Sequence, residues 1–426
     1  MSPTRRLSRV LCTAFFTENK HSSSHILAIL CLRCVVAGTG ILGIPHALSR
    51  SGWVGLVFLL LSAAMFQFCG ILLIRCLTYR QPHRLSGFAE IGQVAFGKPG
   101  MIVGGVFSQL LLVFTPTLYL ILAGDNVSRL ANVVHLSIGR EACTWILTAI
   151  IGIPYTLVRT MRDVSFMSFF ACMATVCLLL VTTAVAVSDA QSETGASTAA
   201  HHDWALPENI PIAFSTFSFS FCGNVIFPQL EASMATPHRW PQVQLVATVC
   251  ITVMYSLMGL LCYMVYGSEV FNPVFDSLPQ GTAQNVAMIV TTVHVLLAIP
   301  MYLYVFTLSV EAWLFQQEAS SPWRLFVKQH PFATRAVVRT AQISFCAVVA
   351  MFTPYFSDFM SLLGTIASES LTFVLPCVFW IKLAWTRREG QFRELLTCLI
   401  IAIAGTFCAV FGTADALKAF LQDFRK

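Results

Sequence analysis

The sequence predicts an all-α integral membrane protein with eleven transmembrane helices, and two observations carry that prediction. The first is composition: 56% of the 426 residues are hydrophobic and 11% are charged, against about 25% charged residues in ordinary soluble domains. So few charged side chains cannot cover the surface of a soluble protein of this length. The second is that the apolar residues gather in runs of about 20, which cross roughly 30 Å of hydrocarbon as a helix. Runs of that length exclude a β-barrel.

Eleven runs reach this length, each bounded by charged or turn-forming residues. They cover residues 25–48, 53–77, 99–124, 141–158, 163–187, 209–232, 242–266, 285–315, 336–354, 358–382 and 397–418. The segments between them are too short to bury a soluble core, so we expect one transmembrane domain over 25–418. A cytosolic N-terminal tail, 1–24, precedes it and a C-terminal tail, 419–426, follows it. No secretory signal peptide is expected in the polar, basic N-terminal tail.

The basic residues of the loops predict the orientation in the membrane. With a cytosolic N-terminus, 19 Lys and Arg residues fall on the cytosolic side and six on the other. This excess follows the positive-inside rule, and eleven helices then place the C-terminus on the lumenal or extracellular side. The net charge of +6 is dispersed over the loops and forms no stripe, so no nucleic-acid partner is expected.

Several other classes of protein lack sequence support. Most of the 15 cysteines lie inside apolar runs, and no paired CxxC spacing suggests a metal site or a disulfide framework. A Walker A motif, which an ATP-driven pump would need, is absent from the sequence. The HExxH and GxSxG motifs of hydrolases are absent too. The sequence therefore predicts neither an enzyme nor a bound cofactor.

The first and sixth predicted helices each contain a glycine five residues before a proline near mid-membrane: Gly40 and Pro45 in one, Gly223 and Pro228 in the other. The two prolines are 183 residues apart. Shifted by that offset, the third predicted helix falls on the first part of the eighth, and the fourth and fifth fall within one to three turns of the ninth and tenth. An odd number of helices per repeat inverts the second copy. The sequence thus predicts a five-plus-five inverted repeat with broken helices 1 and 6 and an additional helix 11.

Broken helices inside a membrane favour a transporter, because unwinding frees N–H and C=O groups that lipid cannot satisfy but a substrate can. The N-termini of half-helices attract a carboxylate, and freed carbonyl oxygens accept an ammonium group or a cation. A zwitterionic amino acid fits both. Alternatively, the glycines serve close helix packing or a kink. The candidate substrate-binding residues are Gly38, Thr39, Gly40, Ile41, Leu42, Gly43, Ser220, Cys222, Gly223 and Asn224.

Four segments carry a family resemblance: GTGILGIP (38–45), AGDN (123–126), FPQLEASM (227–234) and LTFVLPCVFWIKL (371–383). In this order they resemble the amino acid/auxin permease family, and within it the vacuolar and vesicular neutral amino acid transporters. The likeness runs over 25–418. It implies a LeuT-type fold, amino acid substrates and secondary active transport, commonly driven by protons in those members. It also implies a vacuolar or vesicular membrane rather than the plasma membrane.

The chain departs from the family pattern at two places. Where the family commonly carries an asparagine ahead of Gly-x-Gly, this chain has Cys34 and Val36. This departure argues against a sodium site, so a proton is the expected coupling ion and sodium is the alternative. The usual Pro-Tyr-Ala is Pro45-His46-Ala47 here, which places a titratable imidazole beside the first break.

Ionisable residues inside predicted helices are functional candidates, since a charge at mid-bilayer costs about 2.5–3.5 kcal/mol on insertion scales. Glu369 lies eleven residues into the tenth predicted helix, near the midplane, and is the first candidate for proton coupling. The alternative is a structural Glu369 hydrogen-bonded to its flanking serines or to a neighbouring helix. His294 and His46 are the further proton-coupling candidates, with a satisfied local hydrogen bond as the alternative for each.

The sequence as a whole predicts a secondary active transporter of amino acids, of neutral ones in particular, coupled to protons by symport or antiport. The expected partners are the amino acid and the lipid bilayer, and a monomer is expected. The alternative is a non-transporting amino acid sensor that uses the same pocket. A sensor would be expected to carry a longer cytosolic extension than the tail 1–24.

Overall fold

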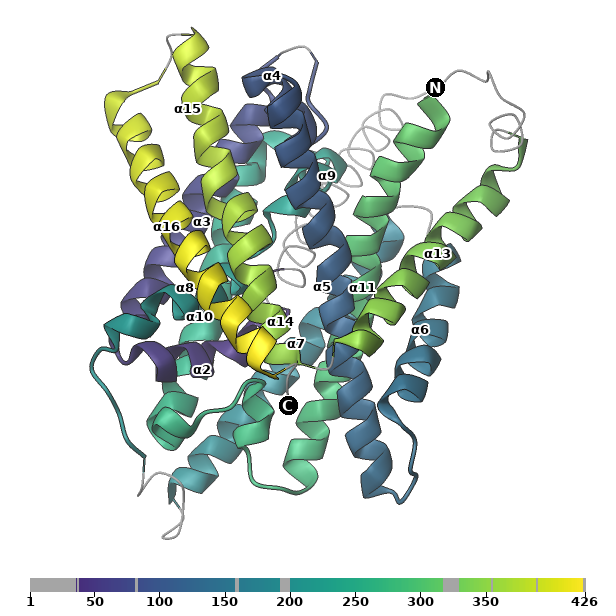
Figure 1. Ribbon diagram of the computed structural model, residues 1–426, viewed down its shortest axis with the longest axis vertical. Helices are drawn as coiled ribbons and strands as arrows, with labels where there is room; N and C mark the ends of the chain where they lie inside the picture. Colours follow the sequence, from purple (N-terminus) through teal and green to yellow (C-terminus); the bar gives the residue numbers. More distant parts are fainter. Residues whose placement is uncertain are drawn as a thin grey trace, which may run out of the picture.

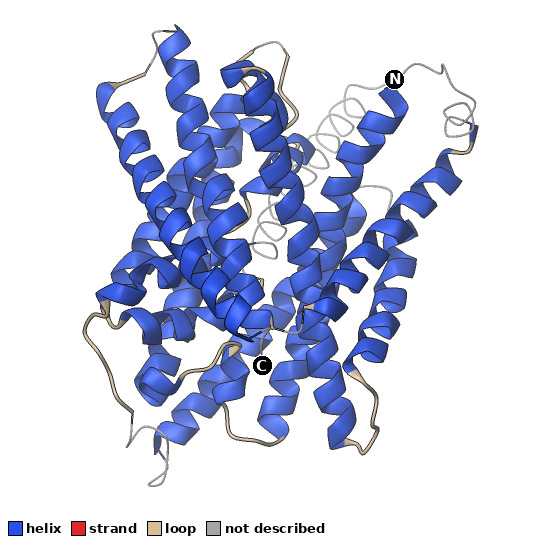
Figure 2. Ribbon diagram, viewed as in Figure 1, coloured by secondary structure: helices blue, strands red, loops and turns tan. Residues whose placement is uncertain are grey.

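The computed structural model describes residues 36, 38–80, 83–157, 161–191, 200–316, 329–353, 355–387 and 390–423. Within these ranges the chain forms helices joined by loops and turns, and no strand (Figure 2). The described cysteines form no disulfide, and most of them are buried. The prediction of an all-α protein is confirmed.

Figure 1 shows how the helices of the described ranges are arranged. They are α2 Gly40–Ser51, α3 Val54–Leu77, α4 Phe88–Phe96, α5 Lys98–Val133, α6 Arg140–Leu157, α7 Met161–Gln191, α8 Ile210–Ser220, α9 Phe227–Ser233, α10 Trp240–Tyr266, α11 Thr282–Gln316, α13 Pro331–Phe352, α14 Phe356–Leu363, α15 Leu375–Arg387 and α16 Phe392–Asp423. A π-helical segment, Gly364–Ser368 and Ser370–Val374, joins α14 to α15.

Nine of the described segments are long and apolar enough to cross a membrane. The 18-residue α6 corresponds to the fourth predicted helix. The first predicted helix, 25–48, lies largely outside the described residues, as does the predicted tail 1–24. The count of eleven therefore stays a prediction.

Three boundaries differ from the prediction. The segment 78–98, expected as a connection, contains α4, and α5 continues to Val133 rather than ending at 124. At the C-terminus, α16 continues to Asp423, five residues beyond the predicted end of the last span at 418. With nine residues, α4 is too short to cross a membrane, so a search for apolar runs of about 20 residues does not indicate it.

The inverted repeat is clearest in α5 and α11. A shift of 183 residues carries the ends of α5, Lys98 and Val133, to positions 281 and 316, and α11 covers Thr282–Gln316. The two helices are antiparallel neighbours. Near the middle, Tyr119 and Tyr302 pack with ring centroids 5.9 Å apart; further along α5, Asn126 donates a hydrogen bond to Thr292, earlier in α11 (3.2 Å).

The second predicted break lies at the centre of the molecule. Residues 221–223 separate α8 from a 3₁₀ turn, Asn224–Ile226, which leads into α9. In the most apolar 18 residues of this broken segment, 83% of positions are buried, against 28% in α16. The broken helix is therefore an inner element, and α16 lies at the periphery, as Figure 1 shows.

We call the end of the molecule that carries α4 and the connection from α15 to α16 the α4 face; it lies at the top of Figure 1. There α4 packs closely on the start of α5. A methyl group on Gly92 would collide with the carbonyl group of Gly100, and one on Gly100 with that of Gly92. This pair of glycines lets α4 lie against the membrane-spanning helices.

Candidate functional site at the broken helices

The first break brings the start of α2 against the end of α8. Gly38 and Thr39 are not helical, and the helix begins at Gly40. A Cβ atom on Gly40 would lie 2.5 Å from the Cα atom of Ser220. In return, the Ser220 hydroxyl lies 3.1 Å from the Gly40 carbonyl oxygen and 2.7 Å from that of Thr216. The two breaks are thus in direct contact, which only a residue without a side chain permits.

Tyr255 of α10 joins the two breaks through their carbonyl groups. Its hydroxyl lies 2.5 Å from the carbonyl oxygen of Val36 and 2.7 Å from that of Ser220. A hydroxyl carries one hydrogen, so the two carbonyls share a single donor. Carbonyl groups freed by unwinding are satisfied here by a side chain, as a membrane interior requires. The role of Tyr255 could not be predicted from the sequence, because its partner atoms belong to the backbone.

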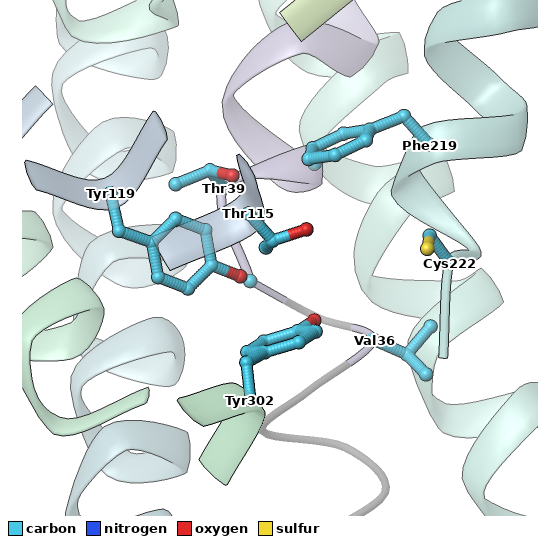
Figure 3. Close-up of a pocket in the computed structure, with 9 residues that line it drawn as sticks. Val36, Thr39, Thr115, Tyr119, Phe219, Cys222 and Tyr302 are labelled. Carbon is cyan, nitrogen blue, oxygen red and sulfur yellow. The ribbon is translucent and has the colours of Figure 1, made fainter. Parts of the chain in front are cut away.

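A small closed cavity lies between the breaks and the long helices α5 and α11 (Figure 3). We call it the central cavity. Its lining residues are Val36, Gly38, Thr39, Gly40, Thr115, Tyr119, Phe219, Cys222 and Tyr302. The cavity volume is about 10 Å³, about what one water molecule needs. The structure therefore represents a closed arrangement of the breaks.

The lining residues carry no formal charge, but they include hydroxyl groups with free hydrogen-bonding capacity. The side-chain oxygens of Thr39 and Thr115 are buried without a partner among the described residues. Figure 3 shows the rings of Tyr119 and Tyr302 on one side and Phe219 and Cys222 on the other. The cavity thus combines apolar and aromatic walls with unsatisfied hydroxyls, as is typical of small-molecule sites.

Tyr119 and Tyr302 are lining residues that the sequence analysis missed. They stand 183 residues apart, the same offset that relates Pro45 to Pro228. Applying the offset residue by residue to the third and eighth helices would have identified the pair. Each inverted copy therefore contributes one tyrosine to the centre of the molecule.

The candidate residues from the breaks fall into two groups. Gly38, Thr39, Gly40 and Cys222 line the central cavity. The others do not line it; they are Ile41, Leu42, Gly43, Ser220, Gly223 and Asn224.

The second group makes packing contacts around the breaks. A Cβ atom on Gly43 would lie 2.6 Å from the Met360 methyl carbon, and one on Gly223 would lie 2.6 Å from a Val36 methyl carbon. Ile41 and Leu42 are buried core residues. Close helix packing, the alternative considered for these glycines, thus describes their contacts in the closed arrangement.

Glu369 lies within the π-helical segment, which is hydrogen-bonded to both sides of the second break. On one side, the hydroxyl of Ser368 donates to the carbonyl oxygen of Ser218 in α8 (3.0 Å). On the other, the amide of Asn224 donates to the carbonyl oxygen of Thr372 (3.0 Å). π-Helical turns are rare and occur frequently at functional sites. Glu369 is thereby positioned one residue from one of these bonds and three from the other.

The Glu369 side chain is fully buried, and neither carboxyl oxygen has a hydrogen-bond partner among the described residues. Ser370 donates instead to the carbonyl oxygen of Ile366 (2.8 Å), and Ser368 to Ser218. The flanking serines therefore do not satisfy Glu369, contrary to the structural alternative from the sequence.

The two candidate histidines lie apart from the central cavity. His294 of α11 is buried, and its Nδ1 lies 2.8 Å from both the Thr175 hydroxyl and the Ala171 carbonyl oxygen of α7. Nδ1 thus makes the local hydrogen bond considered as the alternative, whereas Nε2 is buried without a partner among the described residues. His46, after Pro45 in α2, is half-buried, and neither histidine is among the cavity-lining residues.

The fold matches that of a solved membrane transporter. A manganese transporter of Eremococcus coleocola superposes with a TM-score of 0.59 at 10% identity, covering 96% of this chain and 89% of that one. With the broken helices and the inverted repeat, this match defines a LeuT-type fold. The family model for the transmembrane amino acid transporter protein family matches residues 21–418, and the chain belongs to that family. Its members are transporters, not enzymes.

Curated relatives agree with this assignment over nearly the whole chain. The amino acid transporter AVT1J of Arabidopsis thaliana is 26% identical over 91% of this chain and 89% of its own length. AVT1C of the same plant is 27% identical over 94% of this chain and 70% of its own length. The vesicular inhibitory amino acid transporter of Xenopus tropicalis is 24% identical over 92% of this chain and 72% of its own length. The family resemblance seen in the sequence is confirmed.

Proposed function

We propose that this transporter moves neutral amino acids by secondary active transport coupled to protons. The observation that carries the proposal is the central cavity, where two helix breaks, two unpaired threonine hydroxyls and an uncharged lining meet. An amino acid with a charged side chain would need a compensating charge at such a site. A neutral side chain needs only the apolar and aromatic walls.

The zwitterionic part of the substrate has partners at the breaks. The first N–H groups of α2, beginning at Gly40, lie at the positive end of a helix dipole and suit a carboxylate. The carbonyl oxygens of Val36 and Ser220 suit an ammonium group, and in the closed arrangement the Tyr255 hydroxyl occupies them. Substrate entry would therefore require Tyr255 to release at least one carbonyl as the cavity widens.

Glu369 is the residue we assign to proton coupling. A buried carboxylate without partners is costly by several kcal/mol, so the closed arrangement suits a neutral, protonated Glu369. Since its segment is bonded to both halves of the second break, a change in its charge would act on the element that opens. His294 and His46 remain secondary candidates, because neither contacts the central cavity.

The membrane and the orientation are part of the same proposal. The vesicular transporter among the relatives and the charge distribution of the loops favour an internal membrane with the α4 face toward the cytosol. With this orientation, the N-terminus is cytosolic and the C-terminus lumenal.

Uptake by purified protein in liposomes tests the proposal. A panel of the twenty labelled amino acids is supplied to proteoliposomes with and without a pH gradient. We expect accumulation of one or more neutral amino acids above equilibrium only when the gradient is present. A preference for charged amino acids would contradict the neutral assignment, and accumulation driven by sodium alone would contradict proton coupling.

A further inference from the structure

A second cavity lies between α4, α5, α11 and the 3₁₀ turn with α9. Its volume is about 190 Å³, far larger than that of the central cavity. We call it the α4-side cavity. The polar residues that line it are Ser86, Ser108, Gln109, Gln229 and Ser309.

The α4-side cavity continues the central cavity toward the α4 face. On α5, Thr115 lines the central cavity and Leu112 lines the α4-side cavity. On α11, Tyr302 lines the central cavity and Val305 lines the α4-side cavity. Three residues along a helix correspond to about 4.5 Å. The broken helix repeats the order, with Cys222 on the central cavity and residues 225 and 229 on the second. Three separate elements thus place the two cavities about one turn apart.

On two facing elements of this cavity, a glutamine has a side-chain oxygen without a partner in the described part of the chain. The side-chain oxygens of Gln109, on α5, and Gln229, on α9, are buried and accept no hydrogen bond from any described residue. An unsatisfied buried polar atom costs about 1–3 kcal/mol. Both helices could carry apolar residues there, as Leu112 does on α5. The unpaired amides therefore point to a polar ligand.

The chemistry of the lining indicates the class of that ligand. The lining residues include no acid, no base and no histidine. Each amide carries an acceptor oxygen and two donor hydrogens, so a pair of amides can accept from an ammonium group and donate to a carboxylate. Carboxamides bind both ends of a zwitterion without adding net charge.

We propose that the α4-side cavity is a second amino acid site, held by Gln109 and Gln229, which the substrate occupies between the central cavity and the α4 face. The inference rests on the proposed function and adds a second binding site along the transport route. The walls of the α4-side cavity are connected by Arg84, which donates hydrogen bonds to the Pro228 carbonyl oxygen (2.6 Å) and to Glu231. Loosening this contact opens the site to solution.

Side-specific kinetics test the second site. Gln109→Met and Gln229→Met keep side-chain length but remove the amide, and Gln93→Met makes the same change on the exposed surface of α4. The probe is the amino acid with the largest uptake in the twenty-member panel. Transport into and out of liposomes with one known protein orientation gives a KM for each face.

The expected result is a KM at the α4 face raised about tenfold by either cavity variant, as the loss of one charge-assisted hydrogen bond predicts. The KM at the opposite face should stay within twofold, and Gln93→Met should change neither. If the glutamines had a purely structural role, their loss would change the KM at both faces or at neither face. Either of those results overturns the second site.

A charge-adding variant tests the same site without removing its hydrogen bonds. Gln229→Glu keeps the shape of the side chain and adds a negative charge, so lysine should become a several-fold stronger competitor of the probe at the α4 face only. An unchanged competition by lysine, in protein that still transports the probe, would contradict the proposal.

The two proposals fail in different ways. If the wild-type protein transports none of the twenty amino acids from either face, the proposed function fails and the second site fails with it. If the wild type transports and the glutamine variants keep the wild-type KM at the α4 face, only the second site fails.

Discussion

Gly40 is the single residue on which the contact between the two breaks depends most. A Cβ atom there would lie 2.5 Å from the Ser220 backbone, so the breaks must move apart to admit it. We expect Gly40→Ala to lower the free energy of unfolding by about 1–3 kcal/mol, as overpacking does, and to reduce uptake at least tenfold. Thermal unfolding in detergent and initial uptake rates measure both effects.

Gly105→Ala is the matched control for Gly40→Ala. Its Cβ atom would have no neighbour closer than 3.7 Å, the Cβ of Ala89, and alanine favours a helix by up to about 1 kcal/mol over glycine. Unchanged or slightly raised stability is expected. Normal stability and uptake in Gly40→Ala itself would show that the breaks need not approach this closely.

Tyr255 offers a second test at the residue scale. Tyr255→Phe leaves the Val36 and Ser220 carbonyl oxygens without their shared donor, which should cost about 1–3 kcal/mol of stability. Tyr79→Phe removes a 3.2 Å hydrogen bond to the Leu383 carbonyl oxygen at the α4 face, where water can replace it, and should cost less. Equal losses in the two variants would argue against a special role for the Tyr255 hydroxyl.

At the scale of elements, two arginines connect α6 with α13. Arg140, at the start of α6, donates to the Met351 carbonyl oxygen near the end of α13 (2.8 Å) and lies 3.7 Å from Asp125 of α5. An arginine beside the last carbonyls of a helix is favourable, because those carbonyls form the negative end of its dipole. This contact ties α5, α6 and α13 together at the face opposite α4.

The second contact repeats this pattern nearer the α4 face. Arg339 of α13 donates to the carbonyl oxygens of Tyr155 and Thr156 at the end of α6 (3.2 and 3.3 Å). It also lies 3.7 Å from Glu311 of α11. The helices α5, α6, α11 and α13 thus form a frame that the two arginines connect near both ends of α6.

We expect the frame to depend mainly on its buried arginine. Only 5% of the Arg339 side chain is exposed, against 19% for Arg140. Arg339→Met should therefore cost about 3 kcal/mol, since it leaves a buried carboxylate without one partner. Arg335→Met removes an exposed partner of the same Glu311 and should cost under about 1 kcal/mol. Thermal unfolding ranks the variants, and a loss from Arg335→Met equal to that from Arg339→Met would contradict the frame.

At the scale of the whole molecule, the sequence was sufficient for the helical class and for the repeat, because hydropathy and a fixed 183-residue offset are properties of the chain itself. The offset relates the observed ends of α5 to those of α11 to within one residue, although hydropathy alone predicts the end of α5 nine residues too early. The sequence could not distinguish residues that line the central cavity, such as Thr39, from those that pack around the breaks, such as Gly43. That distinction depends on which helix lies opposite.

Contacts between segments distant in the sequence could not be predicted either. Tyr255 acts on backbone atoms, and Gln109 and Gln229 stand out only because the folded chain leaves their amides unpaired. Glu369 could be singled out, since an acid near the midplane is unusual. Its π-helical surroundings and its bonds to both halves of the second break could not be predicted from hydropathy.

The orientation of the whole molecule is testable by glycosylation in eukaryotic cells. An acceptor sequence inserted after Gly281, in the loop opposite the α4 face, should be glycosylated, and one inserted after Gly390 should not. The chain already contains one acceptor sequence, Asn126-Val127-Ser128. It should stay unmodified, because the Asn126 side chain is buried and hydrogen-bonded to Thr292 (3.2 Å). Modification after Gly390 would reverse the proposed orientation.

Transport by Glu369→Gln tests the central claim, that this buried carboxyl group couples amino acid movement to protons. Glutamine keeps the shape and hydrogen bonding of the side chain but cannot ionise. In proteoliposomes, the variant should lose accumulation driven by a pH gradient while exchange of internal for external amino acid continues, because exchange does not require the empty, deprotonated carrier to return. Accumulation and pH dependence equal to those of the wild type would remove Glu369 from the mechanism.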